Sequence, residues 1–166
     1  MRATLIVDGK AFELEIEEKE LKKLKEKPKH TGYERVSANE RYYYSNGKGE
    51  IISCPETCYV LDDVFYDEAN YYSDKTLAEH NARADKLMRQ LRRFAAEHNA
   101  ETVDRQTVRA NGAWAIRYED GSVGAKHVIS TYVGDIYFDS SDTTMLAVRE
   151  FYDELVWYFE EYKDSL

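Results

Sequence analysis

The clearest periodic pattern in the chain runs from Asn70 to Asn99, where apolar residues recur at steps of three, four and seven. This spacing places them on one face and predicts an amphipathic helix. Ser73 or Asp74 is suited to accept the first free backbone N–H groups, and Asn99 is suited to end the helix. The apolar positions are Leu77, Ala84, Leu87, Met88, Leu91, Phe94 and Ala95.

A second amphipathic pattern predicts a final helix that ends near Tyr162. Asp139, Ser140 or Ser141 is suited to cap its start. Its buried side would use Met145, Val148, Phe151 or Tyr152, Leu155, Trp157 or Tyr158, and Phe159.

Strand-like runs precede the helix in the first half of the chain. Arg41 to Tyr44 and Glu50 to Ser53 flank Ser45-Asn46-Gly47, which has the composition of a turn and predicts a hairpin. Tyr59 to Leu61 suggests a further short strand, and residues 62–68 an acidic loop with interleaved aromatic residues. Tyr71 and Tyr72 then lead into the helix.

The second half repeats this order. Trp114 to Tyr118 and Val123 to Ile129 predict strands around an Asp120-Gly121 turn, and Tyr132 to Phe138 predicts an aromatic strand. We therefore predict an α+β fold of tandem βββα-like units, residues 33–99 and 111–166. Their helices would cover one side of a joined antiparallel sheet in a two-layer domain.

An additional element precedes the two units. Ala3 to Val7 and Ala11 to Ile16 flank Asp8-Gly9, a strong signal for a two-residue hairpin turn. A short charged helix is expected over Glu18 to Lys27, ended by Pro28. Such a short helix is unstable alone, so residues 1–29 would pack on the rest of the chain or on a second copy in a homodimer.

The chain is acidic, with 32 acidic and 23 basic residues among 166 and a formal charge of −9. Nucleic acid and membrane surfaces repel such a protein unless a local basic patch overrides the mean. Its 14 tyrosines suit protein recognition, or they line a sheet. We find neither an apolar run of about 20 residues nor a secretory signal, so we expect a cytoplasmic protein without membrane contact.

The sequence contains no recognisable catalytic motif. Cys54 and Cys58 are its two cysteines, and a structural zinc site needs four ligands, so no metal or other cofactor is expected. Residues 45–49 lack the spacing of a phosphate-binding loop, and no nucleophile elbow occurs. The acidic segment 62–68 contains carboxylates of the kind that bind magnesium, but no following lysine completes a nuclease pattern. We therefore expect a protein that is not an enzyme.

Four segments resemble a group of small accessory proteins of bacteriophages and mobile elements: ATLIVDGKAFELEIEEKELKKL, ERYYYSNGKGE, NYYSDKTLAEHNARADKLMRQLRRFAAEHN and GDIYFDSS with FYDELVWYFEEY. The group is related by a tyrosine-rich hairpin, an aromatic strand and an alanine-rich helix. This class includes inhibitors of bacterial defence, anti-CRISPR proteins among them. The resemblance thus implies action in the bacterial host cell by binding a defence protein, such as a CRISPR nuclease or its guide complex.

Two hypotheses follow. In the first, acidic and tyrosine-rich surface imitates nucleic acid and inhibits the defence protein. The partner-binding residues would be Tyr42, Tyr44, Asp62, Asp63, Tyr66, Asp67, Glu68, Glu150, Asp153, Glu154, Glu160 and Glu161. In the second, the chain binds nucleic acid through the basic face of the central helix. That face contains Arg83, Lys86, Arg89 and Arg93. The acidic residues have a simpler explanation as solvated surface that aids solubility.

Overall fold

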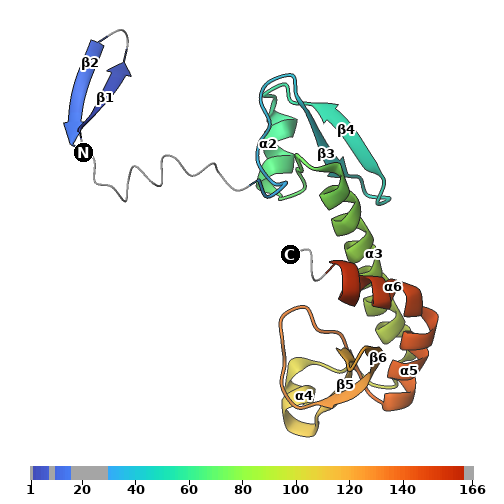
Figure 1. The fold of residues 1–166 in the computed structure, drawn as a ribbon. Helices are drawn as coiled ribbons and strands as arrows, with labels where there is room; N and C mark the ends of the chain where they lie inside the picture. Colours follow the sequence, from blue (N-terminus) through green and yellow to red (C-terminus); the bar gives the residue numbers. More distant parts are fainter. Residues whose placement is uncertain (1, 8–9, 16–29, 163–166) are drawn as a thin grey trace.

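The computed structural model describes residues 2–7, 10–15 and 30–162 (Figure 1). At the N-terminus, β1 (Arg2–Val7) and β2 (Lys10–Glu15) pair antiparallel, with Arg2 opposite Glu15. The predicted N-terminal hairpin is thus confirmed. The helix expected over Glu18 to Lys27 lies outside the described residues.

The central helix predicted from the periodic pattern is α3 (Lys75–His98). The Asp74 carboxylate caps its start by accepting a hydrogen bond from the Leu77 backbone N–H at 3.0 Å, and Asn99 ends it. Leu77 and Met88 are half-buried rather than buried. The buried residues are Ala78, Ala82, Ala84, Leu87, Leu91, Phe94 and Ala95.

In the first half, β3 (Arg41–Ser45) and β4 (Ile51–Pro55) form the predicted hairpin. The next element, α2 (Val60–Asp67), is a helix, so the strand over Tyr59 to Leu61 and the acidic loop were wrong. The Asp62 carboxylate accepts the Tyr59 backbone N–H at 3.0 Å in the first turn. Acidic residues are favourable there because the free N–H groups carry partial positive charge.

In the second half, a short helix not foreseen in the polar connector, α4 (Arg105–Asn111), precedes the strands. The predicted hairpin is β5 (Ala113–Glu119) and β6 (Ser122–Val128). The predicted aromatic strand shortens to β7 (Tyr137–Phe138), which pairs with β5.

The final helix is divided into three segments. Ser140 caps α5 (Ser141–Glu150), and a break at Phe151 separates it from α6 (Tyr152–Trp157). A π-helical turn, η1 (Tyr158–Tyr162), follows directly. None of the helices in the part of the chain that the structure describes has the length and apolar character needed to cross a membrane.

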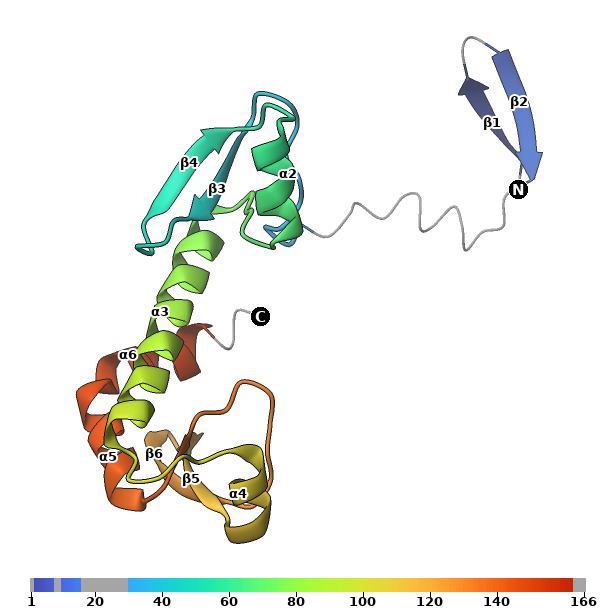
Figure 2. The same ribbon diagram turned by 180° about the vertical axis from the view of Figure 1, so that it is seen from behind.

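The two halves share a strand order. In each, the aromatic segment after the hairpin pairs with the hairpin's first strand: Tyr72 bridges Tyr43, and Phe138 lies opposite Trp114. The predicted α+β class is confirmed, but β3–β4 and β6–β5–β7 are separate sheets, so the joined sheet does not form. Figures 1 and 2 show them at opposite ends of α3.

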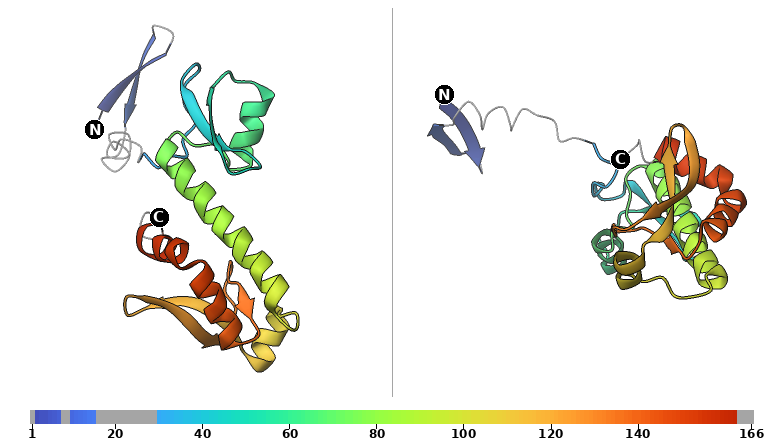
Figure 3. Two further views of the ribbon diagram at one scale, coloured as in Figure 1. Left: turned by 90° about the vertical axis from the view of Figure 1, so that its right-hand side faces the viewer. Right: turned by 90° about the horizontal axis from the view of Figure 1, so that it is seen from below.

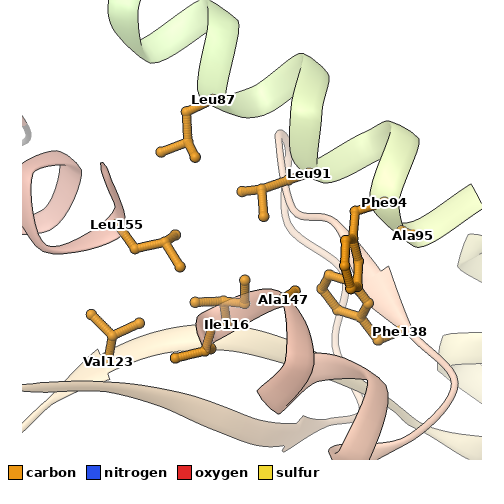
Figure 4. Close-up of a cluster of buried hydrophobic side chains, with 10 residues drawn as sticks. Leu87, Leu91, Phe94, Ala95, Ile116, Val123, Phe138, Ala147 and Leu155 are labelled. Carbon is orange, nitrogen blue, oxygen red and sulfur yellow. The ribbon is translucent and has the colours of Figure 1, made fainter. Parts of the chain in front are cut away.

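Each end of α3 therefore packs in a different core (Figure 3). Near its N-terminus the core is aromatic, and the rings of Tyr42 and Tyr71 stack with centroids 4.1 Å apart. Near its C-terminus the core is mainly aliphatic, with Leu91, Ile116 and Leu155 pointing toward one another from α3, β5 and α6 (Figure 4).

Candidate binding surface

Helix α2 turns apolar side chains toward solvent and an acidic one toward the core. Val60, Leu61 and Val64 are 71%, 64% and 41% exposed, whereas Asp62 is 5% exposed. Residues 60, 61 and 64 share one face at 3.6 residues per turn, and residue 62 lies on the opposite side. A helix that covers a core normally has the reverse arrangement.

We call the outward surface the α2 face and define it by its exposed residues: Tyr59, Val60, Leu61, Val64, Asp67 and Glu68. Tyr59 extends its apolar end, and Asp67 and Glu68 form its acidic end. Neither of these two carboxylates is in an ion pair with a described residue. Clustered apolar side chains with a charged edge are typical of protein-binding surfaces.

A buried carboxylate holds α2 in this orientation. Asp62 accepts hydrogen bonds from the Tyr42 hydroxyl at 2.8 Å, from the Thr57 hydroxyl at 2.8 Å and from the backbone N–H groups of Thr57 and Tyr59, both at 3.0 Å. Burial alone would raise the pKa of Asp62, but these hydrogen bonds outweigh burial and hold the pKa far below its usual value. Burial and the bond to Asp62 raise the pKa of Tyr42.

A second buried carboxylate, Glu56, anchors the turn before α2. It accepts two hydrogen bonds from the Arg35 guanidinium at 3.0 and 3.1 Å, one from the Tyr71 hydroxyl at 2.8 Å and one from the Cys58 backbone N–H at 2.8 Å. The Arg35 bonds hold the pKa of Glu56 below its usual range, against the effect of burial. Arg35 also pairs with Asp63 at 2.6 Å, so it links the turn to α2.

These two networks are structural in character. Both carboxylates have donors around them, and every buried side-chain nitrogen and oxygen atom among the described residues has a hydrogen-bond partner. Within the same residues, no three His, Cys, Asp or Glu side chains are grouped to hold a metal ion. The arrangement holds the surface in place, because the loss of any of these bonds would leave a buried carboxylate with fewer hydrogen-bond donors.

The structure corrects part of the predicted partner-binding set. Tyr42 and Asp62 are buried against each other and present no surface to a partner. Tyr44 is half-buried, with its ring stacked on Phe65 at 4.2 Å. Tyr66 is exposed but packs edge-on against Tyr71. The other predicted acidic residues in and directly after α2 are exposed: Asp63, Asp67 and Glu68.

The acidic residues of the C-terminal helices are placed differently. Glu154 forms an ion pair with Arg83 at 2.7 Å, and Glu160 accepts a hydrogen bond from the Tyr118 hydroxyl at 2.6 Å. Glu150 and Asp153 line a cleft that also contains Arg83, Lys86 and Arg149, and Glu161 is exposed. Basic side chains therefore compensate part of this acidic surface.

The basic face of α3 is also partly compensated. Arg83 pairs with Glu154, and Arg93 lies 3.8 Å from Glu97. Lys86 and Arg89 are exposed. Binding of nucleic acid by this face stays a prediction, but the pairing of Arg83 leaves it less free charge than the sequence suggested.

Sequence reasoning missed the apolar half of the α2 face and the ion pair of Arg35 with the buried Glu56. A helical signal was present, because Val60, Leu61 and Val64 have the spacing of one helix face. The strand predicted over Tyr59 to Leu61 contains the first two, and the structure replaces it with this helix. No local pattern connects Arg35 with Glu56, which are 21 residues apart.

Comparison with known proteins adds no relative. No protein-family model, no curated protein and no solved structure matches the chain.

Proposed function

We propose that this chain is a non-enzymatic binding protein that docks its α2 face on a partner protein. The observation that carries the proposal is the reversed burial of α2, with Val60 and Leu61 outside and Asp62 inside. Exposing such side chains to water costs a free energy of about 25 cal/mol per Å² of apolar area. Binding to a partner surface would recover this free energy, because it removes the side chains from water. Exposed patches of this kind mark interaction sites in soluble proteins.

The acidic end of the α2 face indicates the chemistry of the partner. Asp67 and Glu68 complement a surface with an apolar centre and lysine or arginine side chains beside it. Basic channels of nucleases contain such side chains because they bind phosphate. Together with the resemblance to phage accessory proteins, this supports a bacterial defence effector as partner, namely a CRISPR nuclease or its guide complex. The activity would be inhibition by occlusion of the channel.

A binding and cleavage assay tests the proposal. The full chain is titrated into a panel of purified, guide-loaded CRISPR nucleases, and target cleavage and complex formation are measured. Leu61→Asp should weaken both complex formation and the inhibition of cleavage by at least about tenfold, since it places a charge in the centre of the interface. The matched control is Leu146→Asp, at a leucine that is 50% exposed on α5. It should behave as the wild type.

Two results would contradict the proposal. If no nuclease in the panel is bound or inhibited, the proposed class of partner is wrong. If Leu61→Asp and Leu146→Asp weaken binding equally, the partner does not use the α2 face. Urea unfolding of both variants controls for loss of folding.

A further inference from the structure

A cavity of about 630 Å³ is lined by Met88, Leu91 and Arg92 from the C-terminal half of α3. Helix α2 lies near the opposite end of α3 (Figure 1). The floor of the cavity consists of Leu91, Ile116 and Leu155, three members of the aliphatic core with exposed fractions of 9% or less. The side chains of all three converge in Figure 4. The volume falls within the range of sites for small organic ligands, and a molecule bound there would extend the core.

A second wall is the segment between β6 and β7. Tyr132 and Val133, which are 63% and 94% exposed, line the cavity together with Gly134. The Tyr132 backbone N–H donates to the Tyr137 hydroxyl at 2.9 Å, which fixes one side of this segment. An apolar ligand would remove the Tyr132 and Val133 side chains from water and so gain affinity from their burial.

The π-helical turn η1 forms the third wall through Tyr158 and Phe159. A π turn widens the helix by one residue and changes the direction of its side chains, and such turns occur frequently at functional sites. Three walls of apolar and aromatic side chains therefore favour a ligand with an apolar body.

The charged side chains at the cavity indicate a second property of the ligand. Arg117 and Asp135 line it but neutralise each other, with nitrogen and oxygen 2.5 Å apart. Arg92 lines it as well, is exposed, and forms no ion pair or hydrogen bond with a described residue. The cavity thus has one uncompensated positive charge in a protein whose net charge is −9. A single carboxylate on the ligand would complement it.

We propose that this cavity binds a small organic molecule with an apolar body and one carboxylate. The body contacts Leu91, Ile116 and Leu155, and the carboxylate accepts hydrogen bonds from the Arg92 guanidinium. The proposal does not depend on the function of the α2 face, which lies in the other half of the chain.

Decanoate and decanol form a matched pair of probes, because they share the apolar chain and differ in the carboxylate. Binding to the full chain is measured by calorimetry below the micellar concentration. Amide signals in a ¹H–¹⁵N NMR spectrum locate the site. Decanoate should shift the amide signals of Leu91, Val133 and Gly134. The amide signal of Leu61, on the α2 face, should stay unchanged. Decanoate should bind at least about tenfold more tightly than decanol.

Arg92→Gln should abolish this preference without changing the affinity for decanol. Arg93→Gln is the matched control, since Arg93 is the next residue on α3, pairs with Glu97 and does not line the cavity. It should retain the preference.

Three results would overturn the inference: no binding of decanoate at about 1 mM, equal affinities for the two probes, or equal effects of Arg92→Gln and Arg93→Gln. Shifts confined to the α2 face would also overturn it, because the probe would then have bound elsewhere.

Discussion

Arg83 on α3 and Glu154 on α6 form two hydrogen bonds, at 2.7 and 3.2 Å, while the Arg83 guanidinium lies 3.9 Å from the centre of the Trp157 ring. The sequence assigned these residues to opposite hypotheses, a basic nucleic-acid-binding face and an acidic partner-binding helix. In the structure they bind each other and join the central helix to the C-terminal helices.

This pair should contribute modestly to stability, because both side chains are about two-fifths exposed, 42% and 41%. A double-mutant cycle with Arg83→Gln and Glu154→Gln should give a coupling free energy of about 0.5 kcal/mol. Arg83→Gln alone should cost about 1 kcal/mol, since it also removes the contact with Trp157. Urea unfolding measures both values. A coupling of zero would mean that the pair has no net effect on folding.

The hydroxyl of Tyr42 should matter far more than that of Tyr44. Tyr42→Phe removes a hydrogen bond to the buried Asp62 carboxylate and should lower the free energy of unfolding by about 2 kcal/mol. Tyr44→Phe keeps the ring stacked on Phe65 and should change the free energy by less than about 0.5 kcal/mol. A loss for Tyr42→Phe as small as that for Tyr44→Phe would show that the other donors are sufficient to hold Asp62.

Acid should destabilise the protein through Asp62 and Glu56. The folded state holds the pKa of both carboxyls below the usual values, so their contribution is complete above about pH 5 and is lost as the pH falls through the folded-state values. The free energy of unfolding is measured with urea at about pH 6 and at about pH 3. It should therefore fall less between these two pH values for Asp62→Asn than for the wild type. The control is Asp67→Asn, which removes an exposed carboxylate. Its free energy of unfolding should fall as much on acidification as that of the wild type.

Gly112 ends α4 with φ of +75° and ψ of 172°, a conformation that is accessible essentially only to glycine. A Cβ atom there would also clash with the His127 ring. Gly112→Ala should therefore lower the free energy of unfolding by about 2 kcal/mol. Gly124→Ala on β6, where a Cβ has open space, should change it by less than about 1 kcal/mol. If Gly112→Ala left the free energy of unfolding unchanged, the backbone would have to relax at this position.

Local patterns in the sequence were sufficient for most of the secondary structure. Periodicity predicted α3 within Asn70 to Asn99, with Ser73 or Asp74 as the cap, and turn residues predicted the three hairpins. The order of elements in the two halves could also be predicted from the sequence, because it depends on residues that are neighbours in the chain. The α+β class follows from that order.

Only the tertiary structure decided which face of each element is covered. Val60 and Leu61 look like core residues, and Asp62 looks like surface, until the donors from Tyr42 and Thr57 are placed around the carboxylate. The same is true of Arg83 and Glu154, which are 71 residues apart. Composition and spacing describe what a side chain can bond to, whereas its actual partners depend on distances between segments that only folding brings together.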